Sequence, residues 1–96
     1  MDRLLEWDSV KTARNFQKHG IHFEEAALVF DDPLSVSEQD RIEEGEERWQ
    51  TIGTIGGCLL VVVAHTVRLE DQDIEVIRII SARRADKHER RRYEQG

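Results

Sequence analysis

The stretch CLLVVVAHTVR, residues 58–68, decides the fold. Its middle, residues 59–63, is apolar at every position, whereas a strand with one face in solvent alternates apolar and polar residues. We therefore expect this stretch to form a strand at the centre of a sheet, covered on both faces.

The segments around this strand predict an antiparallel meander. Gly56 and Gly57 form a two-residue hairpin turn to a preceding strand at residues 48–55, and the acidic stretch 70–73 makes the turn to a following strand at residues 74–80. A short further strand is expected at residues 34–37, where apolar and polar residues alternate. The acidic residues 38–47 are expected to form a mobile loop.

Helices are expected at both ends of the chain. Asp8 can cap a first helix, with apolar residues at positions 10, 13 and 16, that ends at Gly20. The apolar stripe of a second helix runs from Phe23 to Phe30, and Asp86 with Glu89 forms a capping box for a last helix at residues 87–94. These elements predict an α+β fold in a single domain, residues 1–96: two N-terminal helices, an antiparallel sheet of three to four strands, and a C-terminal helix.

The charge of the chain is unevenly distributed. The net charge of the 96 residues is −6, which does not favour nucleic-acid binding by the molecule as a whole. Residues 1–47 carry 5 basic and 13 acidic groups, whereas residues 76–96 carry 7 basic and 3 acidic groups. The C-terminal segment can therefore present a local cationic surface.

Several function classes find no support in the sequence. Residues 58–64 form an apolar run far shorter than a membrane span, and the N-terminus lacks the apolar core of a signal peptide. With one cysteine, Cys58, the chain cannot form an internal disulfide, so we expect a cytoplasmic protein. There is no phosphate-binding glycine loop and no cluster with metal-ligand spacing, so no cofactor and no metal are expected.

The residues that could carry chemistry are basic, and they lie near the ends of adjacent expected strands. Arg78 stands among isoleucines, where a guanidinium is costly unless it is paired or faces a groove. A cluster of guanidinium groups can hold a phosphate, and histidine can move a proton near neutral pH, so the cluster could cleave RNA through its own 2′-hydroxyl without a metal. The alternative is that Arg78 pairs with Glu75 or another acid and only holds the sheet.

The same residues give the chain a resemblance to a known family, the BrnT toxins of type II toxin–antitoxin systems. The resemblance spans nearly the whole chain, and its most specific parts are Lys18-His19-Gly20-Ile21 and the run RIISAR, residues 78–83. The other matching residues are Trp7, Asp8, Lys11, Asn15, Phe23, Glu25, Ala26, Phe30, Asp31, Glu46, Arg48, Gly53, Val63, Thr66, Arg68, Ala85, Glu89, Arg90 and Tyr93.

The resemblance implies a RelE-like ribonuclease that cleaves RNA without metal and inhibits translation. It also implies a BrnA-like antitoxin, through which alone operator DNA would be bound. The basic residues that match the family are Arg48, Arg68, Arg78 and Arg83, and with His65, which we add on chemical grounds, they are the expected catalytic residues. Residues expected to contact RNA are Thr66, Arg84, Lys87 and Arg90.

Two other readings stay open. The acidic surface and the weak general-base candidates also fit a non-catalytic module that binds a partner and co-represses its own operon. Direct DNA binding by the last helix is the other reading, although its basic residues lie on several faces of a short helix.

Overall fold

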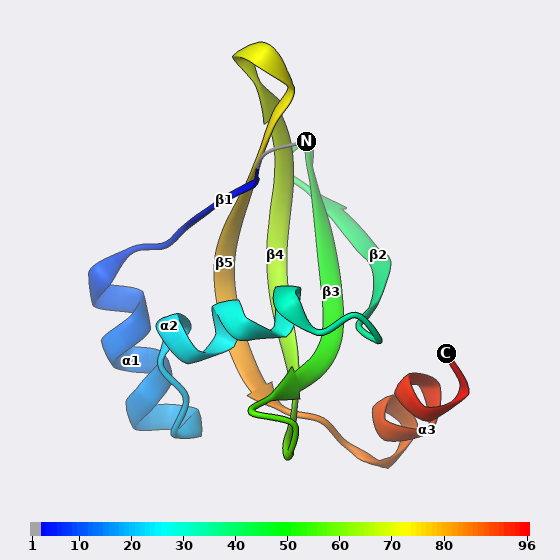
Figure 1. The fold of residues 1–96 in the computed structure, drawn as a ribbon. Helices are drawn as coiled ribbons and strands as arrows, with labels where there is room; N and C mark the ends of the chain where they lie inside the picture. Colours follow the sequence, from blue (N-terminus) through cyan, green and yellow to red (C-terminus); the bar gives the residue numbers. More distant parts are fainter. Residues whose placement is uncertain (1–2) are drawn as a thin grey trace.

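β4 (Leu59–Glu70) is the central strand of a five-stranded sheet, as its apolar run predicts (Figure 1). The computed structural model describes residues 3–96. The other elements in chain order are β1 (Arg3–Glu6), α1 (Ser9–His19), α2 (Phe23–Ala26), the 3-10 helix η1 (Ala27–Asp31), β2 (Val36–Glu43), β3 (Glu46–Ile55), the 3-10 turn η2 (Asp71–Asp73), β5 (Ile74–Arg84) and α3 (Lys87–Gln95). None of the helices within residues 3–96 is long and apolar enough to cross a membrane.

The sheet has one strand more than the three to four expected, and it is mixed rather than antiparallel. Its order is β1-β5-β4-β3-β2, and β1 pairs with β5 in parallel. β1 has only four residues, too few for a period-two pattern to stand out, which is why sequence reasoning missed it. The turn after β3 also has three residues, 56–58, instead of two, and the free Cys58 lies exposed in it.

The expected acidic loop at residues 38–47 is wrong. Most of this segment forms β2 and the start of β3, paired in antiparallel and joined by a tight turn with Gly45 at φ 78°. Exposed acidic side chains are compatible with an edge strand, where charge also discourages pairing with other chains. The acidic composition of residues 38–47 therefore led to a wrong prediction of a loop where two strands lie.

The alternation of side chains along β4 gives the sheet two different faces. Val61, Val63 and His65 point to the face on which α2 and η1 pack, here called the helix face. Leu60, Val62, Thr66 and Arg68 point to the opposite face, here called the arginine face. α3 covers only one end of the arginine face, where Tyr93 packs on Ile52, Leu60 and Val62.

α1 has the predicted caps, but its apolar stripe does not pack on the sheet. Asp8 accepts hydrogen bonds from the amides of residues 10 and 11, and Gly20 ends the helix at φ 73°. The apolar stripe is exposed, however, with Val10 at 55% and Phe16 at 45%. The helix is held instead by the buried Asn15, which donates to the carbonyls of Ile21 (2.8 Å) and Ala82 (2.9 Å) and accepts from the Ala82 amide (3.1 Å). Asn15 thus forms hydrogen bonds with β5 at Ala82, four residues beyond Arg78, where the pairing of β5 with β1 ends.

The second helix is shorter than expected. Only residues 23–26 are α-helical, and the chain continues as η1 across the sheet (Figure 1). A Cβ at Gly53 would lie 2.8 Å from Val29 Cγ1 and 3.1 Å from the Val29 carbonyl oxygen. Glycine at this position of β3 therefore lets η1 lie directly on the sheet.

α3 begins with the predicted capping box of Asp86 and Glu89. Its Tyr93 hydroxyl donates to Asp32 (2.7 Å), and the same carboxylate oxygen accepts from the amide (2.9 Å) and the hydroxyl (3.1 Å) of Thr54. Burial opposes ionisation of Asp32, but these hydrogen bonds and that from the Leu34 amide outweigh it and lower its pKa to about 2. This carboxylate joins α3, β3 and the end of η1.

We predict that Asn15→Ala lowers the free energy of unfolding by about 2–4 kcal/mol, because it leaves the amide and carbonyl of Ala82 without their partner. Gln17→Ala, on the exposed side of the same helix, should change it by less than about 0.5 kcal/mol. Urea unfolding at pH 7 measures both values. Equal stability of the two variants would show that Asn15 does not fasten α1.

Candidate phosphate-binding face

A row of polar residues crosses the arginine face. Glu6 of β1 pairs in register with Arg78 of β5, which pairs with Thr66 of β4. Arg48 of β3 precedes Trp49, the register partner of His65, and so continues the row beyond Thr66. Arg68 lies two residues further along β4 on the same face. Three of the five expected catalytic residues, Arg48, Arg68 and Arg78, therefore share one region of the sheet.

Two guanidinium groups donate hydrogen bonds to the Glu6 carboxylate. Arg78 donates to its Oε2 (2.7 Å) and Arg68 to its Oε1 (3.0 Å). The hydrogen bonds from Arg68 and then Arg78 hold the pKa of Glu6 below its usual value, and the Glu6 bond is the main cause of the raised pKa of Arg68. All three side chains remain between 36% and 46% exposed, so an anion in solution can reach this pair of arginines.

Arg83 is bound more tightly by its acidic partner than Arg68 and Arg78 are by Glu6. It lies opposite Val62, four β4 positions from Thr66 and thus about 13 Å along the strand. Both its terminal nitrogens donate to Glu89 (2.8 and 2.7 Å), whose side chain is 11% exposed. This pairing raises the pKa of Arg83 and lowers that of Glu89. The bidentate pair fastens α3 to β5, so the structure separates Arg83 from the other three arginines.

Arg48 has an unsatisfied donor. Its terminal nitrogen lies 3.8 Å from Glu46, and its buried Nε has no hydrogen-bond partner. Buried donors without a partner are uncommon and costly. Arg48 therefore retains hydrogen-bonding capacity on the arginine face.

His65 lies apart from these arginines, on the helix face. It is 3% exposed, and its ring edge meets Phe30. Its Nδ1 lies 3.3 Å from the Thr66 carbonyl and its Nε2 lies 2.7 Å from the Thr51 hydroxyl. Because a carbonyl only accepts, Nδ1 carries the proton and Nε2 accepts from Thr51. Burial lowers the pKa of His65 to about 4, so the ring is neutral at pH 7 and does not face the arginine row.

The residues expected to contact RNA occupy different environments. Thr66 is 3% exposed, beneath the side chains of the row. Lys87 and Arg90 are exposed on α3, and Arg84 is exposed at the end of β5, where alternation directs it away from Arg83. Arg92, by contrast, pairs with Glu38 of β2. The structure thus places Arg84, Lys87 and Arg90 at the α3 end of the molecule, away from the arginine row.

Sequence reasoning missed a second group of cations on α1. The helix contains three basic and no acidic residues, and Lys11, Arg14 and Lys18 line a hollow of about 200 Å³ with His19 and Ser81. Their spacing of three and four residues, which places side chains on one helix face, was the available signal. Within residues 3–96, none of these three cations forms an ion pair.

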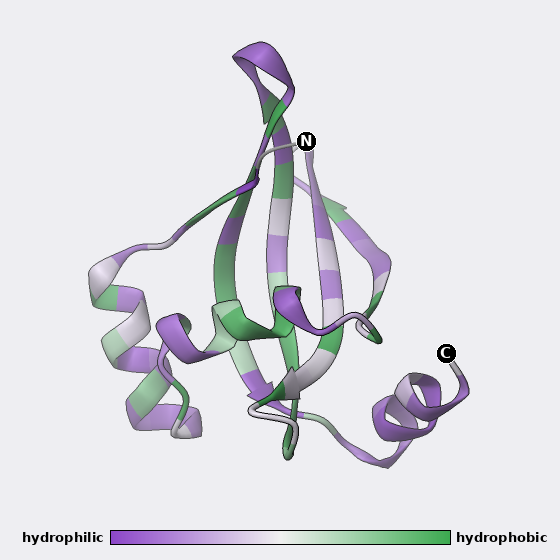
Figure 2. Cartoon of the chain, viewed as in Figure 1, coloured by the Kyte–Doolittle hydropathy of each residue, from purple (hydrophilic) through white to green (hydrophobic). Residues whose placement is uncertain are grey.

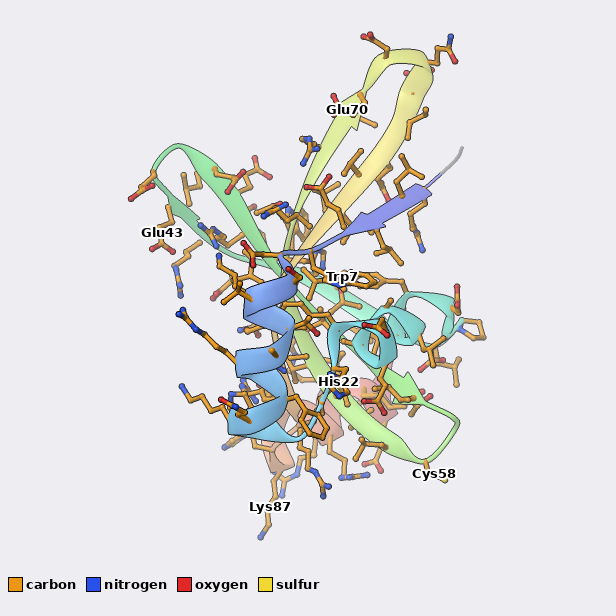
Figure 3. The ribbon with its side chains drawn as sticks, turned by 90° about the vertical axis from the view of Figure 1, so that its left-hand side faces the viewer. Trp7, His22, Glu43, Cys58, Glu70 and Lys87 are labelled. Carbon is orange, nitrogen blue, oxygen red and sulfur yellow. The ribbon has the colours of Figure 1, made fainter. Side chains whose placement is uncertain are left out.

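Figure 3 shows the resulting polarity of the molecule, with Glu43 and Glu70 toward the tips of the two long hairpins and Lys87 at the other end. The described residues, 3–96, contain no group of three or more His, Cys, Asp or Glu side chains placed to hold a metal ion.

Comparison with known proteins identifies the family. The sequence model of one protein family, described as the ribonuclease toxin BrnT of type II toxin–antitoxin systems, matches residues 7–89. The chain belongs to the BrnT family. Membership in this family implies an antitoxin partner. The chain is also similar to the crystal structure of the Brucella abortus ribonuclease toxin BrnT, with a TM-score of 0.59 and 24% identity over 91% of this chain and 100% of that one, a likeness of fold. No curated protein matches the chain.

We predict that His65 makes this BrnT-family protein less stable as the pH falls from 6.5 to about 4. In that window the unfolded chain binds a proton at His65 that the folded protein does not, so the free energy of unfolding falls, by at most about 3 kcal/mol. Denaturant unfolding across this range measures the slope.

His65→Gln should flatten that slope, whereas His88→Gln on the exposed side of α3 should leave it unchanged. Proton NMR of the ring gives the pKa directly. A His65 ring that titrates near 6.5 would contradict the buried, neutral state and restore it as a candidate for proton transfer.

Proposed function

We propose that this protein is an endoribonuclease that cleaves RNA in the cytoplasm without a metal ion and thereby inhibits translation. The observation that carries the proposal is the convergence of Arg68 and Arg78 on one exposed carboxylate. A carboxylate and a phosphodiester both present two oxygens to guanidinium forks. The site that holds Glu6 can therefore hold a scissile phosphate.

Glu6 has a chemical role in this scheme. When Arg68 and Arg78 turn to the phosphate, the hydrogen bonds that lower the pKa of Glu6 are lost, and the carboxylate becomes a better base. It takes the proton of the 2′-hydroxyl, the O2′–P bond forms and the P–O5′ bond breaks, leaving a 2′,3′-cyclic phosphate. The 5′-oxygen takes a proton from water. The arginines, with Arg48, stabilise the charge on phosphorus. His65, neutral and on the helix face, has no step in this scheme.

The remaining cations would guide the RNA. Lys11, Arg14 and Lys18 would hold phosphates on one side of the arginine row, and Arg84, Lys87 and Arg90 would hold them near α3. Arg83, fixed by Glu89, would position α3, and Thr66 would support the row from below. The acidic hairpin tips, which adjoin the row at Glu70 and Glu46, would direct the RNA away from themselves and toward α1 and α3. A BrnA-like antitoxin would neutralise the toxin and bind operator DNA for the complex.

A non-catalytic, co-repressing module is the second candidate function. The observation in its favour is that Arg68, Arg78 and Arg83 each have an acidic partner, as arginines with a purely structural role do. Under this alternative, exchange of Glu6 for phosphate does not occur, and purified protein leaves RNA intact.

We predict that Arg78→Ala reduces RNA cleavage in the presence of EDTA at least about 100-fold, because one of the two phosphate-binding guanidinium groups is lost. Purified protein is incubated with RNA and with ribosome-bound messenger, and the cleavage products are analysed for 2′,3′-cyclic ends.

Arg3→Ala is the matched control. Arg3 also pairs across β1 and β5 with a glutamate, Glu75 (3.3 Å), and its side chain is 47% exposed, but it lies on the helix face. It should keep wild-type cleavage. Loss of cleavage in both variants would point to the β1–β5 pairing rather than to a phosphate site, and wild-type cleavage by Arg78→Ala would refute the site.

We predict opposite effects of Glu6→Gln on binding and on the chemical step. Removing the competing negative charge should lower KM for RNA, because Arg68 and Arg78 become available, while kcat should fall at least about tenfold, because the base is lost. Single-turnover cleavage separates the two quantities. A Glu6→Gln variant with unchanged kcat would show that Glu6 only holds the arginines.

A further inference from the structure

Half of the helix face has no helix on it. α2 and η1 cross only the lower half of the sheet, and the hairpins β2–β3 and β4–β5 extend beyond them (Figure 1). In this open part, a groove of about 300 Å³ is lined by Phe30, Trp49, Val67 and Ile77, together with Ser37, His65 and the ion pair of Arg3 with Glu75. The four apolar and aromatic residues form a surface that can accept a buried side chain, and the Arg3–Glu75 pair adds no net charge to it.

The apolar surface continues from the groove toward both hairpin tips. By register, Ile42 of β2 and Leu69 of β4 point to the helix face, and they are 65% and 64% exposed. Figure 2 shows hydrophobic positions close to the hydrophilic tip of the β4–β5 hairpin. Large exposed aliphatic side chains beside an apolar groove are typical of an interaction surface.

Acidic residues surround this surface. Residues 40–47 contain five acids and one arginine, and residues 69–75 contain four acids and no basic residue. Within residues 3–96, Glu44, Glu47, Asp71 and Asp73 form no ion pair. This field repels nucleic acid. It also opposes a symmetric pairing of two copies through this face, because each acidic rim would then meet another.

We propose that this groove binds a basic amphipathic segment of the antitoxin, with a large apolar side chain between Phe30 and Trp49 and lysine or arginine residues against the two acidic hairpins. This partner has both properties that the surface requires: apolar anchors for the groove and positive charge for the rim. The site lies on the opposite face of the sheet from Arg68 and Arg78. The proposal rests on the antitoxin partner of the family and not on RNA cleavage.

The experiment measures binding of the full-length toxin to the antitoxin encoded beside its gene, by titration calorimetry without RNA. Leu69→Lys and Ile42→Lys should each weaken the complex about tenfold or more, because they place a charge among the apolar contacts and repel the basic partner. Both positions are exposed, so both variants should fold. Leu34→Lys, 68% exposed and away from the groove, is the matched control and should bind within about twofold of wild type.

Charge reversal tests the rim separately. The double variant Glu44→Lys/Glu47→Lys should slow association and reduce its salt dependence, whereas Glu24→Lys on α2 should not. In a Trp7→Phe background, Trp49 is the only remaining tryptophan, and its emission should shift to shorter wavelength when the antitoxin binds.

Wild-type affinity in both Leu69→Lys and Ile42→Lys would overturn the proposal. So would a toxin that forms dimers on its own, seen in sedimentation and abolished by Leu69→Lys, because the groove would then be the toxin's own interface. A protein that does not cleave RNA but loses antitoxin binding on these substitutions would refute the nuclease and leave this site standing.

Discussion

The alternation of side chains along β4 is the constraint on which the rest of the structure depends. Adjacent residues of a strand point to opposite faces, so His65 and Thr66 cannot serve the same site. His65 enters the layer between the sheet and η1, loses contact with water and becomes a neutral hydrogen-bonding residue. Thr66 enters the row of Arg48, Arg78 and Glu6. One central strand thus directs packing residues to one face and the residues of the proposed anion site to the other.

The arginine face depends in turn on β1, the shortest of the five strands. β1 contributes only four residues, but its parallel register with β5 brings Glu6 beside Arg78 and within reach of Arg68. Without this carboxylate, two nearby cations would repel each other. With it, they are held in position until another anion competes. The same ion pairs therefore fit both a structural role and the proposed phosphate site, in which Glu6 holds the two arginines in place.

Individual helices, strands and caps could be predicted from the sequence more reliably than the order and register of the strands in the sheet. The caps at Asp8, Gly20 and Asp86, the central strand and the last helix follow from short-range rules, and the structure confirms them. β1 was not predicted, and β2 was expected only as a short strand at residues 34–37, because edge strands need little apolar pattern and take their order from neighbours distant in sequence. His65 and Arg68 stand three positions apart on one strand, so alternation alone directs them to opposite faces. The position of His65 relative to Arg78 needed the register of β4 against β5, which shifts between Ala64 and His65.

The distribution of charge is compatible with the proposed action of an acidic chain on RNA. Within the described residues, the cations without an ion pair include Lys11, Arg14 and Lys18 of α1 and Lys87 and Arg90 of α3, and the acids without one include Glu44, Glu47, Asp71 and Asp73 near the hairpin tips. At physiological ionic strength charges are screened beyond about 8 Å, so each end of the molecule attracts its own partner regardless of the net charge. Under the two proposals, the acids of residues 40–47 belong to the surface for a basic protein. The proposed RNA site lies on the opposite face of the sheet from this surface, although Arg68 itself reaches the β4–β5 hairpin, where it also pairs with Glu70 (3.3 Å).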